Sequence, residues 1–375
     1  MKQFTQHRRL FLVFLFVLLP GLFASWEYSY AAEAETVSFT PSKDAAENGR
    51  TLTALLGDDS PRTIVFPENG TIKIDRVLWV GDNKTILANG CTIIQTKSRA
   101  PLVLNAVDRT NYKSTRNVRI VGGTWKTVGN NANVAFRFAH SSNLALEDCT
   151  IPTNYQAHGI ELIACKNVTI KGCTVLASGN ASDTSLEEAI QIDVATPATA
   201  PSCADAGTKY VNGQTCENIT VKNCTVRGSR GICCNFTDTS NKKYINKFHK
   251  NIKIIGNTIT GTSSQALTLH NTVGFTVKNN RIITKSKRYS QSYSDGLSIA
   301  MFGSFADSAK YKNSIVNNTI KGGRCCISMN SATNSKFGET TVKSNKLYCK
   351  SGANNAMKLA KCTRLIRTKN ETHQW

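Results

Sequence analysis

Apolar and polar residues alternate in short stretches along this chain, and the same stretch returns at steps of mostly 23 to 38 residues. The nine-residue unit Asn167 to Val175 (NVTIKGCTV) has near copies at Asn143 to Ile151, Asn218 to Val226, Asn251 to Ile259 and Lys312 to Ile320. Alternation with period two is the pattern of a strand with one buried face. The units therefore predict short strands, and one step of 51 residues predicts an insertion within a single repeat.

A second short pattern recurs between these units, beginning with a small residue and then alternating apolar and variable positions. Its copies are Ala135 to Phe138, Gly159 to Leu162, Ala189 to Ile192, Gly231 to Cys234, Ala266 to Leu269, Gly296 to Ile299, Cys326 to Met329 and Ala356 to Leu359. Regular short strands without helical periodicity between them predict a solenoid of stacked parallel strands. A sandwich would show hairpin turns between its strands, and a leucine-rich repeat would need a leucine framework that this chain lacks.

With these repeats, the sequence resembles the right-handed parallel β-helix proteins of the pectate-lyase-like group over roughly residues 36 to 370. The resemblance implies an all-β solenoid of about 9–10 turns, with a short helix over residues 43–56 covering its N-terminal end. That fold hosts lyases, hydrolases, epimerases and non-catalytic adhesins, so it implies an architecture and leaves the reaction open.

The chain divides into three segments by composition. Residues 1–31 combine a basic start (Lys2, Arg8, Arg9) with an apolar run and small residues, the pattern of a secretory signal peptide. We expect residues 32–62 to carry the capping helix and residues 63–375 to form the β-helix. Residues 364–370 look like the start of another turn, which leaves open a truncated C-terminal end. Export predicts a secreted or cell-surface protein, with no stable membrane insertion after cleavage.

Charge narrows the choice of partner. The 375 residues include 46 Lys and Arg against 25 Asp and Glu, a net charge of +21. An exported chain this basic is expected to bind polyanions, although a basic surface can also serve solubility alone. No phosphate-binding loop, zinc-finger spacing or RNA-binding aromatic motif is present, which disfavours nucleic acid. We expect a monomer that binds an acidic polysaccharide or another cell-wall polymer.

The 13 cysteines favour packing over disulfide bonding. Cys149, Cys173 and Cys224 occupy one inward column of the repeat, where cysteine acts as a small apolar residue. Cys203 and Cys216, both within the long insertion, are the best pair for a bridge.

Chemistry-bearing side chains gather at the outward positions of the second strand, on the middle turns. These positions hold His158, Glu161, Glu188, Gln191, Asp193, Arg230, Asn235, His270 and Asp295. Insertions at 194–217, 236–250 and 302–312 leave one side of this strand, and 177–187 and 284–293 approach the other. We expect a groove for an extended polymer, bordered by Lys242, Lys243 and Tyr244 in one loop and by Arg288 and Tyr289 in another. A solvated polar face is the plain alternative.

Three functions suit this face, and a lyase is the leading hypothesis. Elimination from a uronic-acid polymer needs a base and a neutralised carboxylate. The predicted catalytic residues are His158, Glu161, Glu188, Asp193, Arg230 and His270, and Gln191, Asn235 and Asp295 join the loop residues as substrate contacts. Glu161, Glu188 and Asp193 are also a candidate set for Ca²⁺.

The other two functions are a glycoside hydrolase and a binding protein without turnover. The hydrolase would use Glu161 and Asp193 as its carboxylate pair. The binder would be an adhesin or a carbohydrate-binding surface protein. Motifs of familiar enzymes with this fold, such as NTDG, RxPxxR and DPHD, are missing, which weighs against those known activities.

Overall fold

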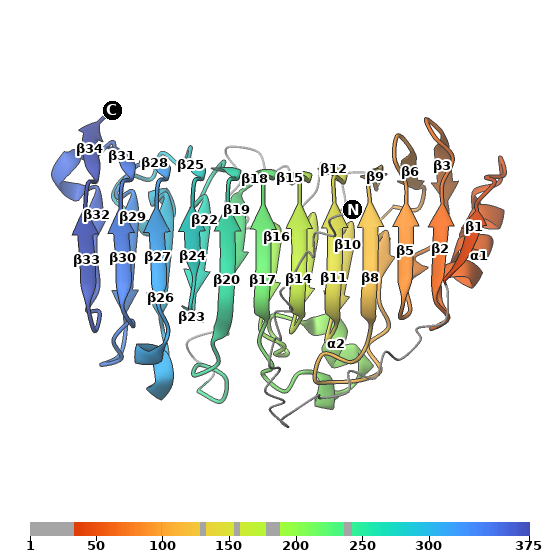
Figure 1. Ribbon diagram of the computed structural model, residues 1–375, viewed down its shortest axis with the longest axis horizontal. Coiled ribbons are helices and arrows are strands. Elements are labelled where there is room, and N and C mark those ends of the chain that lie inside the picture. The colour runs from red at the N-terminus through yellow and green to blue at the C-terminus, as the bar shows by residue number, and fades with distance from the viewer. Residues whose placement is uncertain (1–33, 99, 128–132, 154–157, 178–187, 236–241) are drawn as a thin grey trace, which may run out of the picture. The chain divides into compact units, whose positions relative to one another are not determined.

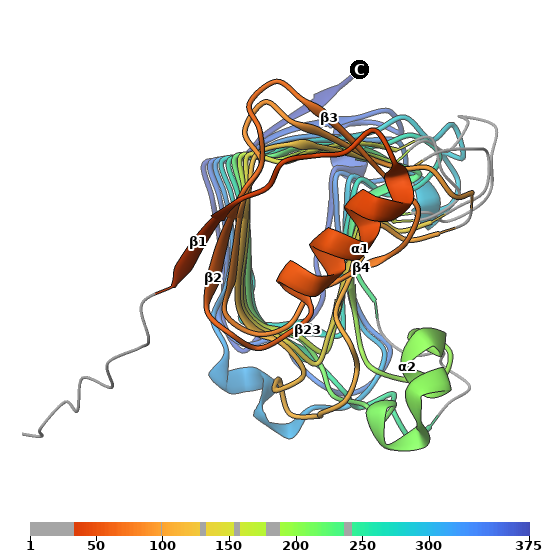
Figure 2. The same ribbon diagram turned by 90° about the vertical axis from the view of Figure 1, so that its right-hand side faces the viewer.

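The computed structural model describes residues 34–98, 100–127, 133–153, 158–177, 188–235 and 242–375. The expected signal peptide lies outside these residues, as does most of the 177–187 insertion. Residues 34–375 form one compact unit built from three parallel sheets, which confirms the predicted all-β parallel solenoid (Figure 1). Viewed along the solenoid axis, the sheets form three sides of a prism (Figure 2).

Most turns contribute one strand to each sheet, in the order A, B, C; the exceptions are the first strand of sheet A, which is followed by a helix, one turn with two strands in sheet A, and the last turn, which has no strand in sheet C. Sheet A contains β1 (Glu35–Ser38), β2 (Arg62–Val65), β5 (Lys84–Leu87), β8 (Arg116–Val121), β11 (Ser142–Glu147), β14 (Lys166–Lys171), β17 (Glu217–Lys222), β20 (His249–Ile255), β23 (Thr272–Val273), β24 (Thr276–Lys278), β27 (Asn313–Val316), β30 (Thr340–Lys343) and β33 (Leu365–Thr368). Sheet B contains β3 (Thr71–Ile74), β6 (Thr92–Gln95), β9 (Thr124–Lys126), β12 (Thr150–Thr153), β15 (Thr174–Ala177), β18 (Thr225–Gly228), β21 (Thr258–Gly261), β25 (Arg281–Thr284), β28 (Thr319–Gly322), β31 (Lys346–Cys349) and β34 (Glu371–Gln374). The predicted nine-residue units span the corner between these two sheets.

Sheet C is formed by the second recurring pattern. Its strands are β4 (Leu78–Trp79), β7 (Val103–Leu104), β10 (Phe136–Ala139), β13 (Ile160–Ile163), β16 (Glu188–Asp193), β19 (Arg230–Cys234), β22 (Leu267–His270), β26 (Leu297–Met301), β29 (Ile327–Ser331) and β32 (Met357–Lys358). The pairing of Glu161 with Gln191 and of Glu188 with Arg230 confirms the register expected from the repeat. Outward side chains on successive turns therefore lie about 4.8 Å apart.

One hydrophobic core fills the prism along its length, from Phe39 to Ala356. Two asparagine ladders follow the turns around it. The outer ladder includes Asn167, Asn218 and Asn251, whose positive φ angles place their amides one above the next, with hydrogen bonds of 2.9 and 3.0 Å. The inner ladder begins at Asn257 and continues through Asn280, at the position where earlier turns carry cysteine.

The helix α1 (Ala45–Leu56) covers the N-terminal end of the prism, as predicted (Figure 2). The carboxylate of Asp44 caps it by accepting a 2.7 Å hydrogen bond from the Ala46 N–H. Its apolar side chains Leu52 and Leu56 are fully buried. At the other end, β33 and β34 pair with β30 and β31, so residues 364–370 do begin a further turn.

The long insertion packs against the outside of sheet C rather than standing beside it. Its helix α2 (Pro201–Ala206) and the 3₁₀ helix η1 (Thr208–Tyr210) lie outside the prism (Figure 2). Ala139 and Ile163, which face outward from β10 and β13, form a second hydrophobic cluster with insertion residues that include Cys203 and Tyr210. On this side, the border of the expected groove is therefore formed by residues of the long insertion that pack against sheet C. The remaining 3₁₀ helices are η2 (Ser292–Ser294), η3 (Ala306–Lys310) and η4 (Ala353–Asn355).

All 13 cysteines lie within the described residues and are free thiols. The inward column of Cys149, Cys173 and Cys224 is buried, as expected. The predicted bridge between Cys203 and Cys216 is wrong. Cys216 lies inside the prism, where its sulfur accepts a 3.2 Å hydrogen bond from the Cys165 N–H, whereas Cys203 belongs to the outer cluster. Within the described ranges, no helix is long and apolar enough to cross a membrane.

Candidate functional site

The candidate site is the outward face of sheet C over β13, β16, β19 and β22, together with His158. We name this set the carboxylate face, and its residues are His158, Glu161, Glu188, Gln191, Asp193, Arg230, Cys233, Asn235, Thr268 and His270. The strand register places them in neighbouring columns on four consecutive turns.

The side chains of this face are buried although they point away from the core. β15 and β18 of sheet B alternate buried residues with half-buried or exposed ones, whereas all residues of β13 and β16 are buried. Glu161, Glu188 and Asp193 are exposed by only 4%, 2% and 0%. Because burying a carboxylate without compensation is costly, each of these groups requires a cation, a hydrogen bond or a proton.

Arginines on adjacent turns compensate two of the three carboxylates. Arg137 on β10 pairs with Glu161, its register partner on β13. Arg230 on β19 pairs with Glu188 on β16, with 2.5 Å between Nη2 and Oε1. Arg137 was not among the residues predicted for the site, although its place in the same column as Glu161 was a usable signal.

His158 is oriented by Glu188. Its Nδ1 lies 3.3 Å from Glu188 Oε2 and 3.2 Å from the Glu188 carbonyl oxygen. Since both neighbours are acceptors, Nδ1 carries the proton in the neutral ring, and Nε2 is left with a lone pair. The imidazole side chain is partly exposed, so this base is within reach of a ligand.

Asp193 has no arginine partner within the described ranges. The Gln191 amide donates a 2.6 Å hydrogen bond to Oδ2, and Oδ1 lacks a hydrogen-bond partner among the described residues, as does Gln191 Oε1. Burial raises the pKa of Asp193 well above its usual value, the charges of Glu161 and Glu188 raise it further, and hydrogen bonds from Gln191 and Asn235 oppose the shift. A carboxyl in this environment tends to keep its proton, and strongly shifted groups of this kind cluster at functional sites.

A buried thiol links Arg230 to the middle of the face. Cys233 Sγ lies 3.4 Å from Arg230 Nη1, 2.8 Å from Asn235 Oδ1 and 2.5 Å from Thr268 Oγ1. Burial raises the pKa of this thiol to about 12, so Cys233 is a hydrogen-bonding group and not a nucleophile.

His270 stands at the edge of the face beyond Asn235. Burial, followed by the nearby Arg230 charge, lowers the pKa of this imidazole to about 3. Its ring meets Phe302 edge-on, with ring centres 5.3 Å apart. His270 is therefore a neutral polar group at ordinary pH, whereas His158 has the oriented lone pair.

The three carboxylates proposed for calcium are not gathered into a metal site. Among the described residues, no three His, Cys, Asp or Glu side chains form a group that could hold a metal ion. Glu161 and Glu188 are instead held by arginines on the neighbouring turns.

The remaining expected contacts lie around the face in different environments. Asp295 is buried and paired with Arg324, with 2.9 Å between Oδ1 and Nε. Arg288 stacks on Tyr293, with its guanidinium carbon 4.1 Å from the ring centre, while Tyr289 is exposed.

The basic loop that contains Lys242, Lys243 and Tyr244 is only partly at the surface. Lys242 and Lys243 are exposed, but Tyr244 is buried, and its hydroxyl donates a 2.8 Å hydrogen bond to the Val211 carbonyl of the long insertion. The Tyr244 ring thus holds two loops together and does not lie open to a sugar.

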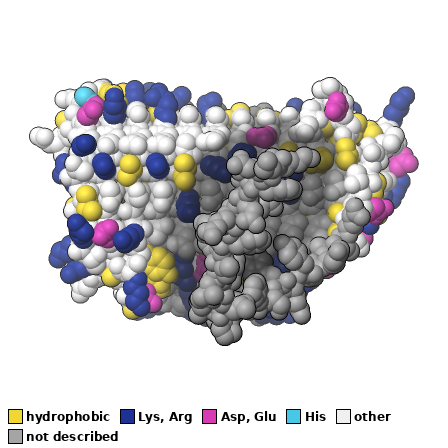
Figure 3. All heavy atoms as spheres, viewed as in Figure 1, with side chains coloured by type: hydrophobic (Ala, Val, Ile, Leu, Met, Phe, Trp, Pro, Cys, Tyr) yellow, Lys and Arg dark blue, Asp and Glu magenta, His cyan; other side chains and the backbone are white. Residues whose placement is uncertain are grey.

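The basic residues are spread widely over the surface. On the side of the molecule formed by sheet A, Lys and Arg side chains follow the upper edge and the C-terminal turns (dark blue, Figure 3). A polyanion therefore meets positive charge beyond the carboxylate face as well.

Comparison with solved structures identifies the architecture. PfbA, a surface adhesin of Streptococcus pneumoniae, is 17% identical at a TM-score of 0.57, with 87% of each chain covered. An endo-xylogalacturonan hydrolase from Aspergillus tubingensis is 12% identical at a TM-score of 0.55, covering 90% of this chain and 93% of the other. No family model and no curated protein sequence matches the chain. The protein is a right-handed parallel β-helix, and at these identities the likeness concerns the fold alone.

Proposed function

We propose that the protein cleaves a uronic-acid-containing acidic polysaccharide by β-elimination at the carboxylate face. The observation that carries this proposal is the Arg230–Glu188–His158 chain, in which an ion pair holds a carboxylate and that carboxylate orients a partly exposed imidazole. A base fixed in one tautomer by a second group is the usual arrangement for proton abstraction.

The reaction assigns one task to each part of the face. His158 Nε2 takes the proton from the carbon beside the uronate carboxyl group, and the electron pair of that C–H bond forms the new double bond. The bond from the adjacent carbon to the glycosidic oxygen breaks, and that oxygen leaves with a proton from an acid or from water. The product has one unsaturated uronate end and one new sugar hydroxyl.

Neutralising the substrate carboxyl is the electrostatic requirement of this step. Arg230 supplies positive charge, and the Gln191 and Asn235 amides can donate hydrogen bonds. A proton on Asp193 adds one further donor, at Oδ1, which has no hydrogen-bond partner in the part of the chain that the structure describes. These groups lie in adjacent columns, so a chain crossing several turns can contact them together.

Elimination suits this face better than hydrolysis. A hydrolase needs two carboxyl groups in complementary roles, one acid and one base or nucleophile. Glu161 and Glu188 are both paired with arginines, whereas no cation of the described residues pairs with Asp193. The described part of the face therefore offers an oriented imidazole more readily than a working carboxylate pair.

Non-catalytic binding is the second candidate function. The observation favouring it is that Glu161, Glu188 and Asp295 are each paired with an arginine from a neighbouring turn, an arrangement that also serves structure alone. The likeness to an adhesin agrees with this function without establishing it. In either case we propose an exported, monomeric protein with residues 1–31 as its signal peptide.

The test is ultraviolet absorbance over time with a panel of acidic polysaccharides, because elimination creates an absorbing double bond. We expect the wild type to raise the absorbance on at least one polymer, and His158→Gln to lower that rate by about 10²–10⁴-fold. His373→Gln is the matched control, since His373 also lies near a glutamate, Glu371 at 3.8 Å, but on β34, outside the face. No rise with any polymer, together with retained binding, would favour the second candidate.

A further inference from the structure

The C-terminal end of the β-helix holds a cavity that the proposed reaction does not use. It has a volume of about 730 Å³ and lies between the ends of β29 and β32 and the loops that follow them. Asn330, which lines it, stands in the same register column as His270 and Ala300. It therefore lies two strand spacings, about 10 Å, beyond the carboxylate face.

Three lysines give this cavity its charge. Lys336, Lys358 and Lys361 line it, and all three are exposed. No Asp or Glu is among the lining residues, and within the described residues none of the three ammonium groups has a carboxylate within 4.0 Å. Charge of one sign lining a concave surface attracts an anion.

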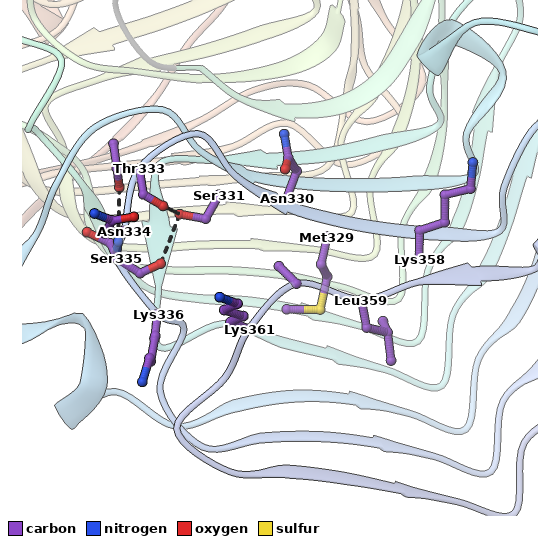
Figure 4. A pocket seen from close by; sticks show the side chains of 11 residues that line it. Met329, Asn330, Ser331, Thr333, Asn334, Ser335, Lys336, Lys358, Leu359 and Lys361 are labelled. Atoms are coloured by element: carbon purple, nitrogen blue, oxygen red, sulfur yellow. Dashed lines mark hydrogen bonds between the residues drawn. The ribbon is translucent and has the colours of Figure 1, made fainter.

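The other lining residues suit a sugar. Figure 4 shows the turn of Ser331, Thr333 and Ser335 on one side, with Met329 and Leu359 forming an apolar surface between that turn and Lys358. Side-chain amides and hydroxyls can hydrogen-bond sugar hydroxyls, and an apolar surface can contact the C–H face of a sugar ring. The lining contains no aromatic ring, so it offers no stacking platform for a nucleic-acid base.

The polar wall is fixed before any ligand binds. The single Ser331 hydroxyl proton is shared between the Thr333 carbonyl, 3.0 Å from Oγ, and the Ser335 carbonyl, 2.9 Å from Oγ, and the Ser335 N–H donates to Thr333 Oγ1 at 3.2 Å. The Ala332 N–H donates a 2.8 Å hydrogen bond to the Met301 carbonyl on β26, the strand next to β29. A wall held in this way loses little conformational entropy when a ligand binds.

We propose that this lysine cavity is a binding site for an anionic saccharide, separate from the carboxylate face and in line with it along the solenoid axis. Its ligand is a segment of acidic glycan whose carboxylate or sulfate groups meet Lys336, Lys358 and Lys361. This inference draws its ligand class from the proposed function but does not require turnover.

The experiment measures equilibrium binding of polygalacturonate, dextran sulfate and neutral dextran to the full chain by titration calorimetry. We expect the Lys336→Ala/Lys358→Ala/Lys361→Ala variant to bind at least one of the two anionic polymers about tenfold more weakly than the wild type. The matched control removes three exposed lysines from sheet A, Lys253→Ala/Lys278→Ala/Lys343→Ala, for the same change in net charge. It should change the affinity by less than about twofold. The two anionic polymers distinguish carboxylate from sulfate recognition.

Equal losses in the two triple variants would overturn the proposal, because net charge alone would then explain the binding. Unchanged affinity in the cavity variant would overturn it as well, as would the absence of anionic-polymer binding by the wild type. A wild type without elimination activity whose binding still depends on the cavity lysines would contradict the proposed function and support this inference. A wild type with elimination activity whose binding does not depend on these lysines would support the proposed function and contradict this inference.

Discussion

Removing one partner of the Arg230–Glu188 ion pair should lower stability far more than removing one partner of an ion pair of similar length on the surface. Its atoms are 2.5 Å apart, and the two side chains are exposed by 13% and 3%. The pair between Lys310 and Asp307 is 2.7 Å long, but its side chains are exposed by 76% and 55%. Removing one partner of a buried pair costs about 3–5 kcal/mol, because the other charge stays desolvated without compensation. An exposed pair contributes about 0–1 kcal/mol.

The two pairs can be compared by double-mutant cycles in urea denaturation. We expect Glu188→Gln and Arg230→Met to cost about 3 kcal/mol or more each, and the double variant to lose much less than their sum, with a coupling of about 2–3 kcal/mol. For Asp307→Asn and Lys310→Met, the coupling should be too small to distinguish from zero, because both side chains are exposed to solvent. A coupling at the buried pair no larger than at the surface pair would refute the description of this face as a desolvated charge network.

Three further predictions concern the inner ladder, Asp193 and His270. Asn280→Leu removes a side chain that makes four buried hydrogen bonds of 2.8–3.0 Å and should lower the free energy of unfolding by about 3 kcal/mol. Asn251→Gly in the exposed outer ladder should lower it by less than about 1 kcal/mol. Equal losses for the two variants in urea denaturation would contradict this difference. Because the folded-state pKa of Asp193 is raised, its unfolded carboxyl ionises first, so the contribution of Asp193 to stability should fall as pH rises above about 4. Asp193→Asn should therefore match the wild type near that pH but exceed its stability at pH 8, as measured by urea denaturation at the two pH values. His270, with a pKa of about 3, should show no imidazole titration by NMR between about pH 5 and 8, and a midpoint in that range would contradict the desolvation of this half-buried ring near Arg230.

Much of the fold could be predicted from the sequence because each turn repeats one pattern of inward and outward residues. Aligning the small residues that begin the sheet C strands placed Glu188 opposite Arg230 and Glu161 opposite Gln191, and the structure has the same register. Shifting the alignment of one strand by one residue would have turned its inward apolar side chains to the outside, so the alternation of apolar and polar positions alone fixes this alignment.

The environment of the site could not be predicted in the same way. The repeat indicates that Asp193 faces outward, but its burial depends on tertiary packing outside the repeat. Tyr244 looked like a sugar-binding ring and is instead buried against the long insertion, through a contact with Val211 far away in sequence. Arg324, the partner of Asp295, lies in a corner between strands and not in an aligned column, so the repeat gave no sign of this pair.

The central claim is tested most directly by the origin of the oxygen in the cleavage products. The wild type is incubated with a polymer that it cleaves, in water enriched in heavy oxygen, and the fragments are weighed by mass spectrometry. Elimination predicts unsaturated fragments that are lighter by one water molecule than hydrolysis products and carry no heavy oxygen. Saturated fragments with heavy oxygen at the new reducing end would contradict elimination and identify the protein as a hydrolase.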